Sequence, residues 1–269
     1  MSGATFVPGS IVFVTVSAFG LCVCFLTVFQ FGVFLFNDGF RYVDVHSRLH
    51  AEGQDAANPY MNNLILDLLL IGAFILQHSL MACRLWKDFI QWLGLDVVER
   101  SLYILATSAS LQVLISYWQP LLPDYLLWSV DIDSRGLRFI FGMLCFLGWL
   151  CVVGVVMVLD YAELVGIKQV YYYVMDLDPP ILMKSREYQR LFKNFRHPVL
   201  TGLLIILWVV PVMSVSRLVL VLSLTLYTCY GHGLDMQDYD YICLQHRLKK
   251  VAQGSPLGYR SRTSSVSYG

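Results

Sequence analysis

Charged residues are scarce in this chain of 269 residues: only 14% are Asp, Glu, Lys or Arg, whereas 57% are hydrophobic. An ordinary soluble domain carries about 25% charged and about 45–50% apolar residues. The deficit excludes most soluble folds and indicates that lipid surrounds much of the protein. Because 19 basic residues balance 19 acidic ones, the chain also lacks the basic excess of proteins that coat nucleic acid. We therefore expect no direct contact with nucleic acid.

Several short motifs are missing as well. The chain has no Asn-x-Ser/Thr acceptor for N-glycosylation, no CxxC pair among its seven cysteines, and no HExxH motif. His78, His197 and His232 are predicted to lie near one face of the membrane, yet they are far apart in the sequence and show none of the spacings of a metal site. We therefore predict no metal site.

Long apolar runs are what the chain has instead. A helix rises about 1.5 Å per residue, so about 20 apolar residues cross the hydrocarbon core of a bilayer. Four segments meet this requirement, namely 10–36, 64–82, 101–118 and 139–159. The first is too long for the core of a signal peptide and has no basic residues before it, so we predict a retained span.

The last apolar region, 199–230, is interrupted by Arg217 and admits two interpretations. It forms either two short spans, 199–213 and 218–230, joined by a tight turn, or a helical hairpin that enters and leaves on one side. We expect two spans and keep the hairpin as the alternative. The predicted fold is thus all-α: a polytopic membrane protein with about six transmembrane helices.

One transmembrane domain is expected over residues 1–250, followed by a Ser- and Gly-rich tail, 251–269, that is predicted to be disordered. With six spans, both termini and the second and fourth loops share one side. All but five of the 19 Lys and Arg residues fall there; the five are Arg41, Arg48, Arg135, Arg138 and Arg217. Because basic residues accumulate on the cytoplasmic side, both termini are predicted to face the cytosol, or the nucleoplasm in a nuclear membrane.

Three polar residues, Asp67, Gln77 and His78, occur inside the second predicted span. An ionisable group there costs several kcal/mol unless it is paired or faces a cavity. Asp67 and His78 are about three helical turns apart and share one face. This polar stripe either lines an internal cavity or, at His78, simply bonds a neighbouring helix near the interface.

A second polar cluster, Arg196-His197-Pro198, precedes the fifth predicted span. Proline suits the first position of a helix, so Pro198 places Arg196 and His197 beside a helix N-terminus. Such a terminus can hold an anion, and ordinary anchoring by basic residues is the equal alternative.

After the last span, His232, Asp235 and Tyr239 are spaced i, i+3, i+7 and share one stripe of a helix. This stripe is expected to meet Arg196 and His197 and close a polar pocket. Alternatively, it is no more than a salt-bridged end to the bundle.

Longer words around these residues carry a family resemblance. They are Gln77–Ala82 (QHSLMA), Arg100–Tyr103 (RSLY), Asp160–Leu164 (DYAEL), Lys168–Tyr172 (KQVYY), Arg196–Val199 (RHPV), and His232–Asp235 (HGLD) followed by Gln237-Asp238. In this order, over about residues 64–242, they resemble the nurim family. The resemblance implies a multi-pass protein of the inner nuclear membrane with a structural or interaction role. It implies membrane lipid, and lamina or chromatin proteins, as partners.

More distantly, the Arg-His-Pro element followed by a last span and an acidic segment is similar to the isoprenylcysteine carboxyl methyltransferase family. There these elements help to bind S-adenosylmethionine. The resemblance implies cofactor-binding candidates and no particular catalytic residue; the candidates are Arg196, His197, Pro198, Gly202, His232, Asp235 and Asp238. The chain departs from that family at Leu200, which replaces an aromatic residue, and at Gln237-Asp238, which replaces paired glutamates. The sequence therefore does not decide whether the chain is an enzyme, and it does not give the oligomeric state.

Overall fold

The computed structural model describes residues 8–40, 60–119, 126–130, 135–194, 197, 199–230, 233 and 235–254. These residues form helices, one two-stranded sheet and short connections. In chain order the elements are α1 (Pro8–Phe40), α3 (Tyr60–Ala82), α4 (Arg84–Trp92), the 3-10 turn η1 (Asp96–Val98), α5 (Glu99–Tyr117), β1 (Leu126–Ser129), α6 (Arg135–Val158), α7 (Tyr161–Leu164), α8 (Ile167–Val174), α9 (Arg186–Asn194), α10 (Leu200–Trp208), β2 (Val212–Ser214), α11 (Val215–Tyr230) and α12 (Met236–Gly254). The predicted all-α class is confirmed.

In the described part of the chain, three helices are long and apolar enough to cross a membrane: Ser10–Asp38 within α1, Met61–Ala82 within α3, and Arg135–Val158, which is α6. A shorter apolar helix, α11, has 16 residues. Large apolar side chains cover the outside of the long helices, as they do where lipid is the solvent. The prediction of a polytopic α-helical membrane protein is confirmed.

Two predicted spans have a different character. α5 has 19 residues but carries several Ser, Thr and Gln side chains, and it is not among the three strongly apolar helices. The run 199–213 contains only nine helical residues, those of α10, because the backbone leaves the helix at Val209, two residues before Pro211. Proline disfavours helical backbone in the residue before it. A helix of this length rises only about 13.5 Å, so the choice between two short spans and a hairpin stays a prediction.

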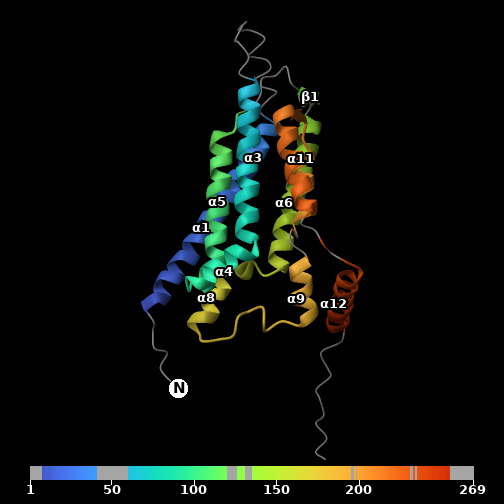
Figure 1. The fold of residues 1–269 in the computed structure, drawn as a ribbon. Coiled ribbons are helices and arrows are strands. Elements are labelled where there is room, and N and C mark those ends of the chain that lie inside the picture. Colours follow the sequence, from blue (N-terminus) through green and yellow to red (C-terminus); the bar gives the residue numbers. More distant parts are fainter. Residues whose placement is uncertain are drawn as a thin grey trace, which may run out of the picture.

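The helices pack as two groups that one core joins. α5 packs against α1 and α3, α10 packs against α6, and α11 contacts both α3 and α10 (Figure 1). The buried core draws on helices of both groups; its members are Leu35, Ile71, Leu114, Trp118, Ile206, Leu207, Leu220, Val221 and Leu224. This shared core fixes the relative positions of the spans.

Two glycines set the close contact between α6 and α10. A Cβ atom at Gly202 would lie 2.7 Å from the carbonyl oxygen of Gly148 and 2.9 Å from the backbone nitrogen of Val152. No larger residue fits such an approach without a shift of the backbone, and small residues are typical of helix contacts in membranes. Gly202, one of the cofactor-binding candidates, thus lies in a helix–helix contact.

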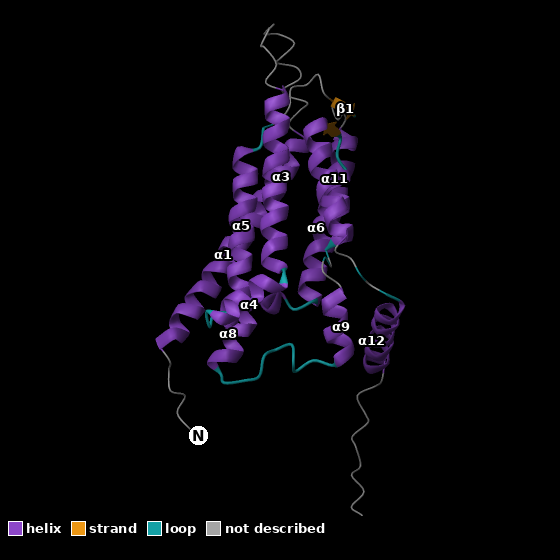
Figure 2. Cartoon of the chain, in the orientation of Figure 1, coloured by secondary structure: helices purple, strands orange, loops and turns teal. Residues whose placement is uncertain are grey.

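The two ends of the bundle differ in structure (Figures 1 and 2). At one end, here called the sheet end, β1 and β2 pair in antiparallel fashion, with Trp128 opposite Met213 and Ser129 opposite Val212. The other end holds the start of α1 and the helices α4, α8, α9 and α12, and is called the amphipathic end. The first and last helices thus meet the same end, an arrangement that an even number of crossings produces.

Candidate functional site

Asp235 and Asp238 together begin α12. The backbone N–H of Asp238 donates to Oδ1 of Asp235 at 3.1 Å, and the N–H of Asp235 donates to Oδ2 of Asp238 at 3.3 Å. Such reciprocal bonds satisfy N–H groups that a helix start leaves without partners. The positive end of the helix dipole also stabilises both carboxylates. The local sequence therefore fixes two acidic groups at one point of the amphipathic end.

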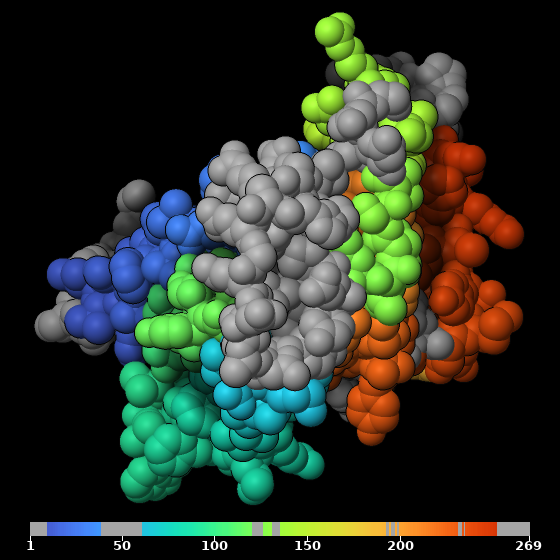
Figure 3. Space-filling model, turned by 90° about the horizontal axis from the view of Figure 1, so that it is seen from above, coloured from blue at the N-terminus to red at the C-terminus, as the bar shows by residue number. Residues whose placement is uncertain are grey.

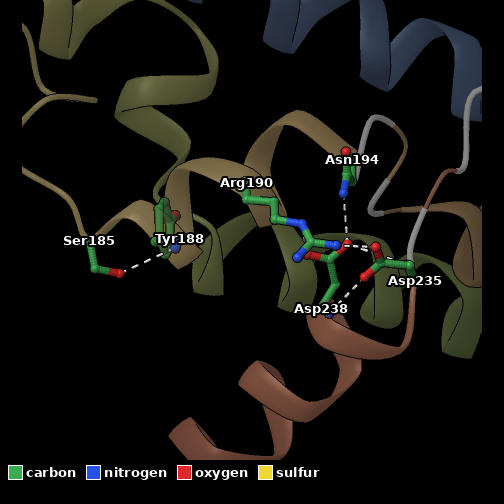
Figure 4. Close-up of polar contacts among 6 residues, drawn as sticks. All are labelled: Ser185, Tyr188, Arg190, Asn194, Asp235 and Asp238. Carbon is green, nitrogen blue, oxygen red and sulfur yellow. Dashed lines mark hydrogen bonds and ion pairs between the residues drawn. The ribbon is translucent and has the colours of Figure 1, made fainter.

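Side chains of α9 hold these carboxylates (Figure 4). Nδ2 of Asn194 donates to Oδ2 of Asp238 at 2.8 Å, Arg190 pairs with Asp235, and Nε of Arg190 lies 3.8 Å from Oδ1 of Asp238. The N–H of Gly233 donates to the carbonyl oxygen of Asn194 at 3.1 Å. The hydrogen bond from Asn194 holds the pKa of Asp238 below its ordinary value, although desolvation opposes this shift. The end of α9 therefore lies beside Gly233 and the start of α12.

Three of the seven cofactor-binding candidates, Arg196, Pro198 and His232, lie outside the described residues. Among the others, Asp238 is buried and Asp235 is exposed. The structure gives these two carboxylates Arg190 and Asn194 as partners, residues that the sequence analysis did not select. The role of the seven residues in cofactor binding stays a prediction.

His78 lies in an aromatic cluster together with His197. The hydroxyl of Tyr103 is 2.7 Å from Nε2 of His78, and Oγ1 of Thr107 is 3.4 Å from its Nδ1. The ring of His78 lies 6.4 Å from that of His197 and 5.8 Å from that of Tyr227. All five residues are half-buried. The cluster ties α3, α5 and α11 to the connection between α9 and α10, so His78 bonds a neighbouring helix.

The two other polar residues of α3 also bond neighbouring segments. Asp67 is fully buried and accepts hydrogen bonds from the N–H of Gln119, at 2.9 Å, and from the hydroxyl of Ser216. Gln77 accepts a hydrogen bond from Ser110 of α5 at 2.8 Å. The polar residues predicted on one face of α3 thus have different partners. Asp67 bonds Gln119 and Ser216, whereas Gln77 bonds α5.

Arg217 does not lie in a break between helices, as the sequence suggested. α11 begins at Val215, so Arg217 is in its first turn, where only 1% of its surface is exposed. Its Nη1 donates to Oδ2 of Asp38 and to the carbonyl oxygen of Leu35, both at 2.9 Å. This pair links α1 to α11 at the sheet end. The sequence did contain an indication of this ion pair: two opposite charges at the ends of two apolar runs, both predicted to lie on the same side of the membrane.

Asp160 and Glu163, which flank the start of α7, each have a lysine partner. Asp160 pairs with Lys168, and the buried Glu163 pairs with Lys184. Burial raises the pKa of Asp160, but the hydrogen bond and charge of Lys168 lower it more, so the net shift is downward. The same hydrogen bond raises the pKa of Lys168. The two carboxylates therefore act as separate ion pairs that fix the chain after α6.

A surface cavity of about 480 Å³ lies beside α9 and α12. Its lining is polar and aromatic, from Asp160, Lys184, Ser185, Tyr188, Tyr241 and Gln245. The cavity is largely open to solvent, whereas small-molecule sites usually enclose most of the ligand. Within the ranges that the structure describes, no group of three His, Cys, Asp or Glu side chains is arranged to hold a metal ion.

The helices and their polar contacts define a polytopic helical membrane protein that gathers short amphipathic helices and ion pairs at one end. Nurim of Bos taurus is 41% identical over 191 residues, which cover 69% of this chain and 71% of that protein. Nurim of Danio rerio is 39% identical over 203 residues (74% and 73%), and nurim of Xenopus laevis is 42% identical over 180 residues (66% and 62%). No family model and no solved structure matches. The chain belongs to the nurim family, so the predicted resemblance is confirmed.

Proposed function

We propose that this chain is a structural or interaction component of the inner nuclear membrane and that its amphipathic end faces the nucleoplasm. Membership of the nurim family is the observation that carries the proposal. The three long apolar helices supply a firm attachment to the bilayer. No enzymatic step is needed to account for these features.

The distribution of basic residues supports the orientation. In the described part of the chain, the sheet end holds Arg135, Arg138 and Arg217, whereas α4, α8, α9 and α12 hold most of the other Lys and Arg residues. Basic residues accumulate on the cytoplasmic side of membrane proteins, and that side is continuous with the nucleoplasm. Both ends of the chain then face the nucleoplasm.

α12 is the element best placed to meet a lamina or chromatin protein. Its main contact within the bundle is with α9. Leu244, Leu248 and Val251 are exposed along it, next to the exposed Lys249 and Lys250. Exposed apolar residues among basic ones are typical of helices that bind a partner. We therefore assign the interaction role first to this helix.

Proximity labelling from the nuclear envelope tests this function. A labelling enzyme fused to the C-terminus is expected to mark lamina and chromatin proteins, whereas one inserted between β1 and α6 marks lumenal proteins. Replacing Leu244, Leu248 and Val251 with Ser should reduce the lamina signal without loss of rim localisation. A control replaces the exposed Leu182 and Met183 in the connection between α8 and α9. Lumenal labelling from the C-terminus would contradict the proposal.

A second candidate function is methyl transfer from S-adenosylmethionine to a lipophilic acceptor. The hydrogen bond between Gly233 and Asn194 favours it, because it brings together the two segments on which the distant resemblance depends. The acidic residues fit a cofactor site only in part. Asp235 and Asp238 are already engaged by Arg190, Asn194 and backbone N–H groups, so they position α9 and α12 more directly than they meet a cofactor.

Calorimetry on detergent-purified protein decides this candidate. Saturable binding of S-adenosylmethionine or its demethylated product, lost in Arg196→Ala, would support methyl transfer, since a guanidinium group orients a carboxylate, such as that of the cofactor, by charge-assisted bonds. Arg186→Ala is the matched control, because Arg186 is exposed at the start of α9. Absence of binding in the unaltered protein would reject the candidate and leave the envelope role.

A further inference from the structure

We propose that α4 lies in the headgroup region of the bilayer and anchors the amphipathic end to the membrane through an apolar stripe, Leu85, Phe89 and Trp92. This interaction surface for lipid goes beyond the proposed function and does not depend on which membrane holds the protein. It rests on the distribution of side chains around one short helix.

The stripe is exposed although it is strongly apolar. Leu85, Phe89 and Trp92 are spaced i, i+4, i+7 and therefore follow one side of the helix. Their exposed fractions are 81%, 48% and 79%. The rings of Phe89 and Trp92 lie 6.2 Å apart and nearly parallel. Such a continuous aromatic and aliphatic surface marks a site of contact with lipid or protein.

A different side of α4 holds it against the bundle. Ile90 is only 3% exposed, and the indole nitrogen of Trp86 is buried. α4 contacts α3 and the turn η1. The exposed stripe is therefore not the side by which the helix packs on its own core, and its position relative to α3 is fixed.

The stripe continues the lipid-facing surface of α3. α3 ends at Ala82, and Cys83, whose extended backbone has φ −75° and ψ 161°, turns the chain directly into α4. Near that end of α3, Leu76 and Leu80 are exposed. In the view down the bundle, the teal segment that contains α4 projects from one side (Figure 3). A helix that turns away where a span ends is placed at the membrane surface.

The charges of α4 fit the same position. Arg84, Lys87 and Gln91 follow a third side of the helix, where headgroup phosphates would meet them, and the exposed Asp88 lies between this side and the stripe. Tryptophan is enriched at this depth of the bilayer. A short helix with one apolar and one basic side is typical of segments that lie in the interface. Lipid is thus the occupant that fits both the apolar and the basic side.

Quenching of Trp92 fluorescence tests the assignment in the full chain reconstituted in vesicles. The vesicles consist of phosphatidylcholine brominated high on its acyl chains. Subtracting the emission of Trp92→Phe from that of the unaltered protein isolates the signal of Trp92. We expect brominated lipid to quench this signal, and the combined substitutions Leu85→Ser and Phe89→Ser to reduce the quenching.

Trp118→Phe is the matched control, because Trp118 is 7% exposed in the core and its difference signal should escape the bromines. Quenching of Trp92 by aqueous iodide without quenching by brominated lipid would overturn the proposal, since the stripe would then face water. A Trp92 signal that neither reagent quenches would overturn it as well, because a protein surface such as a second copy of the chain would then cover the stripe.

Discussion

The sheet end and the amphipathic end use the same residue types for different purposes. At the sheet end, Arg217 and Asp38 form an ion pair that is almost completely buried. At the amphipathic end, Arg190 pairs with Asp235 in a position that leaves 39% and 50% of the two side chains exposed. The first pair locks α1 to α11, whereas the second joins α9 to the start of α12. Burial, more than the presence of charge, distinguishes these two ion pairs.

The energies of the two pairs should differ accordingly. Removing one partner of a buried ion pair costs about 3–5 kcal/mol, because the other charge is left without compensation. An exposed pair contributes only about 0–1 kcal/mol. Substitutions at the two ends therefore provide a direct way to test the contrast.

The largest effect is expected from Arg217→Leu. This change leaves Asp38 buried beside an apolar side chain, so it should lower the free energy of unfolding by about 3–5 kcal/mol. Thermal unfolding of the protein in detergent measures the loss. The double substitution Arg217→Leu with Asp38→Leu should recover most of it, since no charge is then left unpaired. Equal losses in the single and double variants would show that the ion pair is not the cause.

Gly202→Ala should have the next largest effect. The added methyl group meets the backbone of Gly148 and Val152 on α6, and such overpacking costs about 1–3 kcal/mol. Gly154→Ala is the control. Gly154 lies on α6, but no atom would contact a Cβ atom placed there, and alanine favours a helix. If both variants unfold at the same temperature, the close crossing of α6 and α10 is not rigid.

Arg190→Gln should change stability by about 1 kcal/mol, because its close partner Asp235 is half exposed and the buried Asp238, 3.8 Å from Nε of Arg190, keeps its hydrogen bond from Asn194. Salt screens exposed charges, so raising the ionic strength should erase the difference from the unaltered protein. The unfolding midpoint at low and high salt measures it. A loss of stability as large as that of Arg217→Leu would show that the exposed and the buried ion pair contribute equally, which would contradict the contrast between the two ends.

The smallest effect concerns pH at the start of α12. Because the hydrogen bond from Asn194 holds the pKa of Asp238 low in the folded protein, the ionised carboxylate stabilises the fold. This contribution is fully present above the ordinary Asp pKa of about 3.9 and is lost as the pH falls through the lower, folded value. The midpoint difference between the unaltered protein and Asp238→Asn should therefore shrink below about pH 4. A difference that grows on acidification would contradict this assignment.

Periodicity and composition predicted the helical membrane class, because long apolar runs admit few other structures. The early end of α10 was missed, since the run continues without a polar residue while Pro211 breaks the backbone. The partners of Asp235 and Asp238 also escaped prediction. Arg190, which pairs with Asp235, and Asn194, which bonds Asp238, lie 45 and 44 residues before those carboxylates, and only the fold brings them close. Asp38 and Arg217 could have been paired from the sequence. They carry opposite charges, and each lies at the end of an apolar run on the same predicted side of the membrane.

A split fluorescent protein shows which side of the membrane the amphipathic end faces. One fragment is fused to the C-terminus, and the complementary fragment is supplied either in the nucleus or in the lumen of the endoplasmic reticulum. We expect fluorescence at the nuclear rim with the nuclear fragment alone. Fluorescence with the lumenal fragment alone would place the amphipathic end in the lumen and contradict the proposed function.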